Sequence, residues 1–198
     1  MGLVKLEMGC GPRKRISDAI TTDLLDYECV DIVGEIFSVL RRFPDDSVDY
    51  VYSFHFVEHL PDLGLYINEM QRILKVGGTL ELVVPHFSHP HFYSDYTHKS
   101  TFGLYTFDYF TFNSYFKRTS PTYQKRIDLK LDKVDLQFGS FRPFYLRHAI
   151  RFVLGKIVNL CKYTQEFYEE NLCYFLPCSE IKFRLIHCQP QDQDQPLP

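Results

Sequence analysis

The chain of 198 residues carries little net charge and has no long apolar run, and each of these absences excludes a class of partner. The formal net charge is -3, so no strongly basic surface points to a nucleic acid. No apolar stretch reaches the roughly 18 to 20 residues of a membrane span, because Arg151 and Lys156 interrupt the closest one. We therefore expect neither a nucleic acid nor a membrane as partner.

Cysteine pairs with the spacing of a zinc or redox motif are also lacking. The six cysteines are Cys10, Cys29, Cys161, Cys173, Cys178 and Cys188. None of them forms a CxxC pair, and no secretory signal pattern precedes the first apolar run at residues 3–8. The sequence therefore predicts reduced thiols and a cytoplasmic location.

Internal repeats and interdomain linkers are absent too. With 45% hydrophobic and 24% charged residues, the chain can bury a sizeable core as a single domain, which we expect over residues 1–188. The tail at residues 189–198 is rich in Gln, Pro and Asp, cannot build a core, and is predicted to be disordered.

Short apolar runs separated by turn residues predict a series of strands. They lie at residues 3–8, 19–25, 29–36, 47–54, 79–85, 125–138 and 180–187. Apolar residues from Leu63 to Leu74 recur at spacings of four, three and four, which predicts a helix that begins near Asp62 and stops at Gly77. A second helix is expected over residues 145–163.

This alternation predicts an α/β fold whose sheet is parallel over at least its first five strands. Only seven residues separate Gly11 from Ala19, and a crossover helix needs ten or more. We therefore expect the first crossover helix to be shortened or missing.

Two glycines and a series of acids follow the predicted strand ends. Gly9 and Gly11 let a ligand approach the backbone, although a GxG turn is by itself a weak signal. Asp23 ends the second predicted strand, where a carboxylate can accept both hydroxyls of a ribose. Glu35 ends the third predicted strand, and the apolar Ile36 after it could lie against an adenine ring.

The segments "LEMGCGP", "ITTDLL", "DIVGEI", "FPDDSVDYVYSFHFVEHL" and "EMQRILKVGGTLELVVP" together resemble the class I S-adenosylmethionine-dependent methyltransferases. The resemblance covers residues 3 to 110, and it is closest to the small type 11 branch that is often associated with glycan and lipopolysaccharide gene clusters. It implies a Rossmann-like class I methyltransferase sheet, mostly parallel with an antiparallel last strand. The chain departs from the family pattern at Pro12, where many members have a third glycine.

The resemblance also implies a cofactor, S-adenosylmethionine, and a set of residues that bind it. The loop around the methionine part would be formed by Glu7, Gly9, Cys10 and Gly11. Asp23, with Leu24 after it, would hold the ribose, and Glu35 and Ile36 would flank the adenine. Ser53, Phe54 and His55 would face the methionine part and the methyl group.

A stretch rich in histidine and aromatic residues follows the fifth predicted strand. It contains His86, His89, His91, Asp95 and His98. Three interpretations compete: a metal site, a polar loop whose histidines only pack against aromatic rings, and a lid over the substrate at residues 85–120. The prolines and bulky aromatics do not impose the geometry of a metal site, and we expect no metal here.

If the stretch is a substrate-side lid, one of its side chains takes a proton from the acceptor during methyl transfer. His86 directly follows the fifth strand and is the best-anchored candidate, with His98 second and Asp95 third, the last two within a "D-x-T-H" element that resembles this branch. For His59, in "VEHL", a packing or capping role is as plausible as a role in the site.

The function that these features favour is methyl transfer to a small-molecule or glycan-type hydroxyl acceptor. A non-catalytic domain that binds the cofactor or a partner is the alternative. A nicotinamide-dependent oxidoreductase is disfavoured because the turn is not GxGxxG and the helix that would receive a pyrophosphate is missing. The sequence gives no oligomeric state.

Overall fold

A computed structural model describes residues 2–118, 120–121, 123, 128–140 and 143–189. Seven strands form one sheet in the order β3-β2-β1-β4-β5-β7-β6. The strands are β1 Lys5–Met8, β2 Ile20–Asp23, β3 Ile32–Val33, β4 Val48–Phe54, β5 Leu74–Pro85, β6 Leu129–Gln137 and β7 Glu180–His187. The strand β7 runs antiparallel to both of its neighbours, and the pairs among β1 to β5 are parallel. This confirms the predicted α/β sheet with its antiparallel last strand.

Five α-helices and two 3₁₀ turns connect the strands of the described chain. They are α1 Ile36–Leu40, η1 Val57–His59, α2 Leu63–Ile73, α3 Pro90–Ser94, η2 Thr106–Phe110, α4 Tyr145–Val158 and α5 Lys162–Asn171. None of the helices in the described part of the chain is long and apolar enough to cross a membrane.

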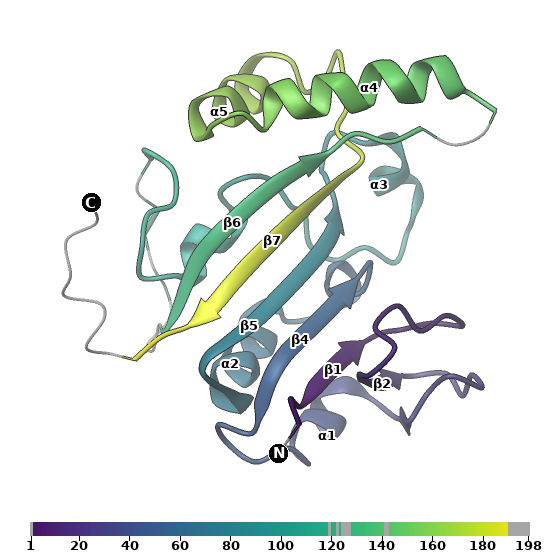
Figure 1. Ribbon diagram of the computed structural model, residues 1–198, viewed down its shortest axis with the longest axis vertical. Coiled ribbons are helices and arrows are strands. Elements are labelled where there is room, and N and C mark those ends of the chain that lie inside the picture. Colours follow the sequence, from purple (N-terminus) through teal and green to yellow (C-terminus); the bar gives the residue numbers. More distant parts are fainter. Residues whose placement is uncertain (1, 119, 122, 124–127, 141–142, 190–198) are drawn as a thin grey trace.

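The connections at residues 9–19 and 24–31, both fully described, contain turns and no helix. The prediction of a missing first crossover helix is therefore confirmed, and the second crossover lacks a helix as well. In Figure 1, α1 and α2 lie behind the sheet, and no helix covers the face toward the viewer. That face is polar: Glu81 on β5 forms ion pairs with Lys182 and Arg184 on β7.

The apolar core lies between the sheet and the helices behind it. Its fully buried side chains include Leu6, Val51, Leu80 and Phe183 from the strands and Tyr66, Ile67 and Met70 from α2. The helix α2 begins at its N-cap Asp62, whose carboxylate accepts a hydrogen bond from Leu65 N at 2.8 Å. The predicted apolar face of this helix is therefore the one that it buries.

Three predicted boundaries are wrong. The helix α2 ends at Ile73 and continues directly into β5, so Gly77 lies inside the strand, with φ +82°, instead of ending the helix. The third strand covers only Ile32–Val33, because residues from 35 onward begin α1. The single helix expected over 145–163 is two helices, α4 and α5. Part of the expected sixth strand, residues 125–127, and the tail from residue 190 lie outside the described residues.

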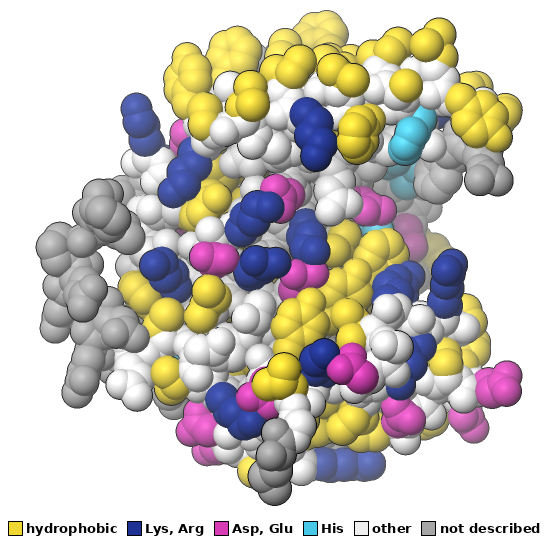
Figure 2. All heavy atoms as spheres, viewed as in Figure 1, with side chains coloured by type: hydrophobic (Ala, Val, Ile, Leu, Met, Phe, Trp, Pro, Cys, Tyr) yellow, Lys and Arg dark blue, Asp and Glu magenta, His cyan; other side chains and the backbone are white. Residues whose placement is uncertain are grey.

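The carboxyl ends of the parallel strands meet at one edge of the sheet, at the top in Figure 1, where α3, α4 and α5 also lie. None of the residues of α4, all of them described, is buried. Figure 2 shows apolar side chains along the outer side of this helix. The same edge also receives the glycine turn after β1, so the fold brings the predicted ligand-binding segments together.

Candidate active site

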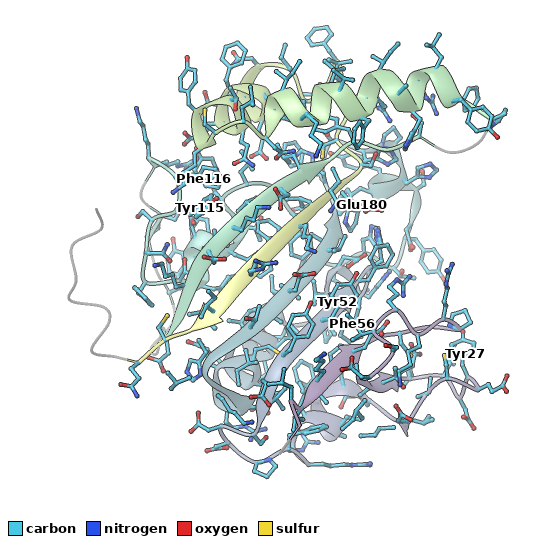
Figure 3. All side chains as sticks on the ribbon, in the orientation of Figure 1. Tyr27, Tyr52, Phe56, Tyr115, Phe116 and Glu180 are labelled. Atoms are coloured by element: carbon cyan, nitrogen blue, oxygen red, sulfur yellow. The ribbon has the colours of Figure 1, made fainter. Side chains whose placement is uncertain are left out.

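The glycine turn after β1 has the left-handed backbone that its sequence predicts. Gly9 and Gly11 have φ of +63° and +59°. A Cβ at Gly9 would lie 2.4 Å from the ring of Phe56, which Figure 3 shows beside Tyr52 near β1. A Cβ at Gly11 would meet nothing within 4 Å. Gly9 is therefore required by packing, whereas Gly11 borders open space that a ligand can occupy.

Asp23, at the end of β2, binds the glycine turn. Its Oδ2 accepts a hydrogen bond from Gly11 N at 2.8 Å, and its Oδ1 accepts one from Leu25 N at 2.9 Å. A carboxylate offers about four lone-pair positions, so two remain for the hydroxyls of a ribose. The neighbouring Leu24 is exposed. The turn and the acid thus fit a nucleoside, as the sequence predicts.

Glu7 holds the loop that replaces the first crossover helix. Its buried carboxylate accepts hydrogen bonds from the amides of Arg15, at 2.9 Å, and Ile16, at 2.9 Å. This path places the guanidinium of Arg15 4.0 Å from the centre of the Phe54 ring. Glu7 therefore shapes this edge of the sheet by fixing the loop. Arg15, which the sequence analysis did not consider, brings a positive charge to the end of β4.

Glu35 lies beside the same edge in an unexpected role. It is the N-cap of α1, and its carboxylate accepts hydrogen bonds from the amides of Phe37 at 3.0 Å and Ser38 at 2.9 Å. The amide of Phe37 is the largest cause of the lowered pKa of this carboxyl group. Glu35 is exposed and follows β3 instead of ending it, and Ile36 is the first residue of α1.

Cys10 is buried behind the glycine turn. Its thiol is 3.4 Å from the carbonyl oxygen of Gly11, and the thiol of Cys29 is 3.3 Å from the same atom. Burial raises the pKa of Cys10 to about 12, and the adjacent Cys29 raises it further. Cys10 therefore stays a neutral thiol that packs under the turn.

The residues that end β4 show two environments. The hydroxyl of Ser53 is buried and has no hydrogen-bond partner among the described residues. His55 has φ +50°, and its ring nitrogens lie 3.2 Å from Glu58 Oε1 and 3.1 Å from Glu180 Oε1. Burial opposes protonation of His55, but the two carboxylates, Glu180 first, outweigh it and raise the pKa of the imidazole to about 9. At neutral pH His55 is therefore an imidazolium and cannot act as a base.

A cavity of about 620 Å³ opens next to His55, at the carboxyl edge of the sheet. Its walls are the ends of β5 and β6, the start of β7 at Glu180, the first turn of α3 and the inner side of α4. Figure 3 places Glu180 below α4, and Figure 2 shows a recess with histidine side chains under the same helix. The histidines that line the cavity are His55, His89, His91 and His148.

The cavity wall carries more positive than negative charge. Arg151 donates to the carbonyl oxygens of Gly139 at 2.7 Å and Pro177 at 3.1 Å. Arg147 donates to Ser140 Oγ at 2.8 Å. Because these partners are neutral, both guanidinium charges remain uncompensated by the described residues. The carboxylate of the wall, Glu180, is paired with His55.

His86, the first-choice base from the sequence, does not line this cavity. It is fully buried, its Nδ1 accepts a hydrogen bond from Ser88 N at 3.2 Å, and its Nε2 donates to Glu169 Oε2 at 3.0 Å. Glu169, on α5, also accepts a hydrogen bond from Leu104 N at 2.8 Å. With no free lone pair and no access to the cavity, His86 joins the end of β5 to α5, and this geometry does not support it as the base.

Asp95 and His98 lie in the loop after α3, outside the lining of the cavity. Asp95 is exposed, and hydrogen bonds from the side chain and backbone of Thr97 lower the pKa of its carboxyl group, which makes it a weaker base. His98 is almost buried and packs against the rings of His59 and Phe92. The structure thus brings His98 to His59, not to the acceptor cavity.

The site includes residues that the sequence analysis did not name. Glu180, Arg147, Arg151 and His148 reach the cavity from segments at least 80 residues away from the glycine turn. These four residues have no local sequence pattern that marks them.

Comparison with known proteins gives a family model for the first half of the sheet. Residues 6–82 match a model described as a methyltransferase domain. No curated protein matches the sequence. The matched range contains the glycine turn, Asp23, His55 and α2, so it covers the cofactor edge described above.

Solved structures with the same fold include several methyltransferases. The S-adenosylmethionine-dependent methyltransferase of Archaeoglobus fulgidus shares 15% identity, with 93% of this chain and 86% of that chain covered and a TM-score of 0.55. Phosphoethanolamine N-methyltransferase 2 of Haemonchus contortus, in complex with S-adenosyl-L-methionine, shares 18% identity over 95% of this chain and 49% of that chain, with a TM-score of 0.53. The YcgJ protein of Bacillus subtilis shares 16% identity, with 94% of this chain and 92% of that chain covered and a TM-score of 0.52. At these identities the likeness shows the fold.

Three observations point to the fold of a methyltransferase: the strand order, the glycine turn and the matched domain. Gly11 leaves open space at the carboxyl edge, and Asp23 offers its carboxylate beside it. The chain therefore has the fold of the class I S-adenosylmethionine-dependent methyltransferases, and its residues 6–82 match a methyltransferase domain.

Proposed function

We propose that the protein transfers a methyl group to a hydroxyl of a small-molecule or glycan-type acceptor that binds in the cavity under α4. The observation that carries this proposal is the position of the cavity, directly beside His55 at the end of β4. S-adenosylmethionine supplies a methyl group that is already activated, so the protein needs mainly to position the acceptor and exclude water. The resemblance to the glycan-associated branch supports the acceptor class.

The charge of the cavity narrows the acceptor further. The uncompensated guanidinium groups of Arg147 and Arg151 favour an acceptor with a carboxylate or phosphate near the reacting hydroxyl. Glu180 is paired with His55 through Oε1, so its second carboxylate oxygen can accept a hydrogen bond from a sugar hydroxyl. An acidic sugar or a phosphorylated sugar has this combination of groups.

His89 is the residue that we propose as the general base. It lines the cavity at the N-cap of α3, and burial, followed by the charges of His91 and Arg151, lowers the pKa of its imidazole. A lowered pKa keeps His89 neutral at pH 7, which a proton acceptor requires. It takes the place of His86, which is fully buried and does not line the cavity.

The test is methyl transfer from labelled S-adenosylmethionine to a panel of neutral, carboxylated and phosphorylated sugars. His89→Gln should lower turnover by about 10²- to 10⁴-fold and leave the affinity for S-adenosylhomocysteine unchanged. Tyr96→Phe is the matched control, because Tyr96 lies in the same loop with 93% of its surface exposed. Methylation of an amine acceptor alone, or full turnover in His89→Gln, would contradict the proposal.

A further inference from the structure

A cluster of metal-ligand side chains lies behind the cavity and takes no part in the function proposed above. Glu58 and His59 come from the turn η1 after β4, and His98 comes from the loop after α3. One ligand atom from each of the three residues lies within 4.8 Å of the other two. Among the residues that the structure describes, this is the one such group found. We propose that Glu58, His59 and His98 bind one divalent transition-metal ion.

The unused lone pair of Glu58 is the first reason. This side chain is fully buried, and its Oε1 is paired with His55 Nδ1 at 3.2 Å. Its Oε2 is also buried and has no hydrogen-bond partner among the described residues. A buried carboxylate oxygen without a partner is unfavourable because its charge is desolvated, unless a cation or a donor satisfies it. A metal ion beside Oε2 removes this cost.

The hydrogen bonds of His98 fix which nitrogen faces the cluster. Its Nδ1 lies 2.8 Å from the carbonyl oxygen of Phe92, which can only accept a hydrogen bond. The proton of the neutral imidazole must therefore sit on Nδ1, and Nε2 presents its lone pair. A carbonyl that orients the second nitrogen of a histidine is the usual arrangement around a metal-bound imidazole.

His59 is oriented in the same way through a longer chain. Thr97 Oγ1 donates to Asp95 Oδ1 at 2.5 Å, so it accepts a hydrogen bond from His59 Nδ1, which is 2.8 Å away. The lone pair of His59 is consequently also on Nε2. A carboxylate that acts through a hydroxyl on a histidine nitrogen is a second feature found around metal ligands.

One ligand atom of each residue lies within 4.8 Å of the other two. When both imidazoles are neutral and carry their proton on Nδ1, their Nε2 lone pairs and the Oε2 atom of Glu58 supply no proton to one another, so a cation is the group that relieves the repulsion in the cluster. Bonds of about 2.0–2.2 Å place ligand atoms about 3–3.5 Å apart, so the side chains close by at most about 1.5 Å on binding. Two imidazoles and one carboxylate suit zinc, cobalt, manganese or ferrous iron.

The ion would connect two segments that already touch. The amides of Lys99 and Ser100 donate to the carbonyl oxygen of Glu58, at 2.7 and 3.3 Å. A metal bond to His98 would add a second link between the loop after α3 and the end of β4. Because His55 lies between Glu58 and the cavity, the ion would also set the charge next to the acceptor.

The sequence analysis disfavoured a metal within residues 86–98 because its prolines and bulky aromatics do not impose the geometry of a metal site. The structure changes the set of ligands: Glu58 and His59 come from the turn η1, and only His98 comes from that stretch. His86 and His89 lie outside the cluster, so the proposal does not depend on the general base or on the identity of the acceptor.

The experiment is a titration of chelator-treated protein with Zn²⁺ by calorimetry and with Co²⁺ by visible absorption. Wild type should bind one ion per chain, with the d–d spectrum of a site that contains nitrogen ligands. Glu58→Gln and His98→Gln should each weaken binding by about 100-fold or more, and Thr97→Val by about 10- to 100-fold, because it removes only the group that orients His59. His91→Gln, in the preceding helix α3 and outside the cluster, should bind as wild type does.

The thermal unfolding temperature gives a second readout that needs no activity. Zn²⁺ should raise it in wild type and in His91→Gln, and leave it unchanged in His98→Gln. If Glu58→Gln does not fold, His98→Gln and Thr97→Val still decide the question. Failure of wild type to bind either ion at millimolar concentration would overturn the proposal, and so would equal affinity in wild type, His98→Gln and Thr97→Val.

Discussion

The proposed cofactor edge and the proposed acceptor side of the site are held together in different ways. At the cofactor edge, acids near the strand ends bind main-chain amides that are at most 12 residues away in the sequence. Asp23 binds Gly11 and Leu25, and Asp31 binds the amide of Thr21 at 2.9 Å. On the acceptor side, side chains from distant segments bind each other: His55 and Glu180 are 125 residues apart, and His86 and Glu169 are 83 apart.

This difference has a physical origin. The connections after β1 and β2 contain no helix, so short loops must be fixed by charged groups that satisfy their amides. The acceptor side is assembled from α3, α4, α5 and β7, which reach the same edge from different parts of the chain. Changes at the cofactor edge should therefore act on cofactor affinity, and changes on the acceptor side should act on stability or turnover.

The largest effect on stability is expected from His86→Ala. The substitution removes a fully buried ring and takes one hydrogen-bond partner from Glu169 and one from Ser88, so the free energy of unfolding should fall by about 2–4 kcal/mol. Urea unfolding measures it. Tyr96→Ala, at a side chain that is almost fully exposed, should stay within about 0.5 kcal/mol of wild type. Equal stability of the two variants would mean that the link from β5 to α5 is weak.

Asp23→Asn should have the next largest effect, and it should appear in binding. The amide keeps the shape of the side chain and removes the charge, so affinity for S-adenosylhomocysteine should fall by about 10- to 100-fold. Asp31→Asn is the matched control, because Asp31 also binds the backbone of β2 but lies outside the glycine turn. If the control loses the same affinity, loop stability and not the ribose contact explains the effect.

Asp108 should give a smaller effect that depends on pH. Its carboxyl group is buried in the 3₁₀ turn η2, and neither oxygen has a hydrogen-bond partner of normal geometry among the described residues. Burial raises the pKa of this acid from 3.8 to about 6, although the amides of Tyr115 and Phe116 oppose the shift. The folded state therefore holds the proton more tightly than the unfolded state does.

The sign of the pH effect follows from this shift. The stability that the raised pKa contributes is complete below about pH 4 and is lost as the pH rises through about 6. Asp108→Asn removes this loss, so its stability relative to wild type should be about 1–2 kcal/mol greater at pH 8 than at pH 4. Chemical unfolding of wild type and Asp108→Asn at pH 4 and pH 8 measures the two stabilities. If the variant differs from wild type by the same amount at both pH values, Asp108 is solvated.

The same contrast explains what the sequence could predict. The strands β1, β4 and β7, the helix α2 and the missing first crossover helix follow from apolar patterns and segment lengths within a few residues. The glycine turn and Asp23 could be located because both follow strand ends directly. The junction of α2 and β5 could not, since Leu74 ends an apolar pattern that suits both elements, and Gly77 resembles a helix stop.

The contacts of the acceptor side are harder to predict because its partners are far apart in sequence. His86 has the position of a base at a strand end, and only the distant Glu169 and the packing of α5 show that it is a buried structural residue. His98 is likewise understood only together with His59 and Glu58. Residue types identified the histidine loop as notable, but the tertiary contacts decide which histidine faces which group.

The most direct test of the account is calorimetry of the purified protein with S-adenosylhomocysteine and NAD in parallel. Gly11 and Asp23 offer a site for a nucleoside and a ribose, and the connection after β1 has no helix to receive a pyrophosphate. We predict one S-adenosylhomocysteine bound per chain, with weaker binding in Asp23→Asn, and no measurable heat with NAD. Tight binding of NAD without any response to S-adenosylhomocysteine would contradict the assignment of the cofactor edge.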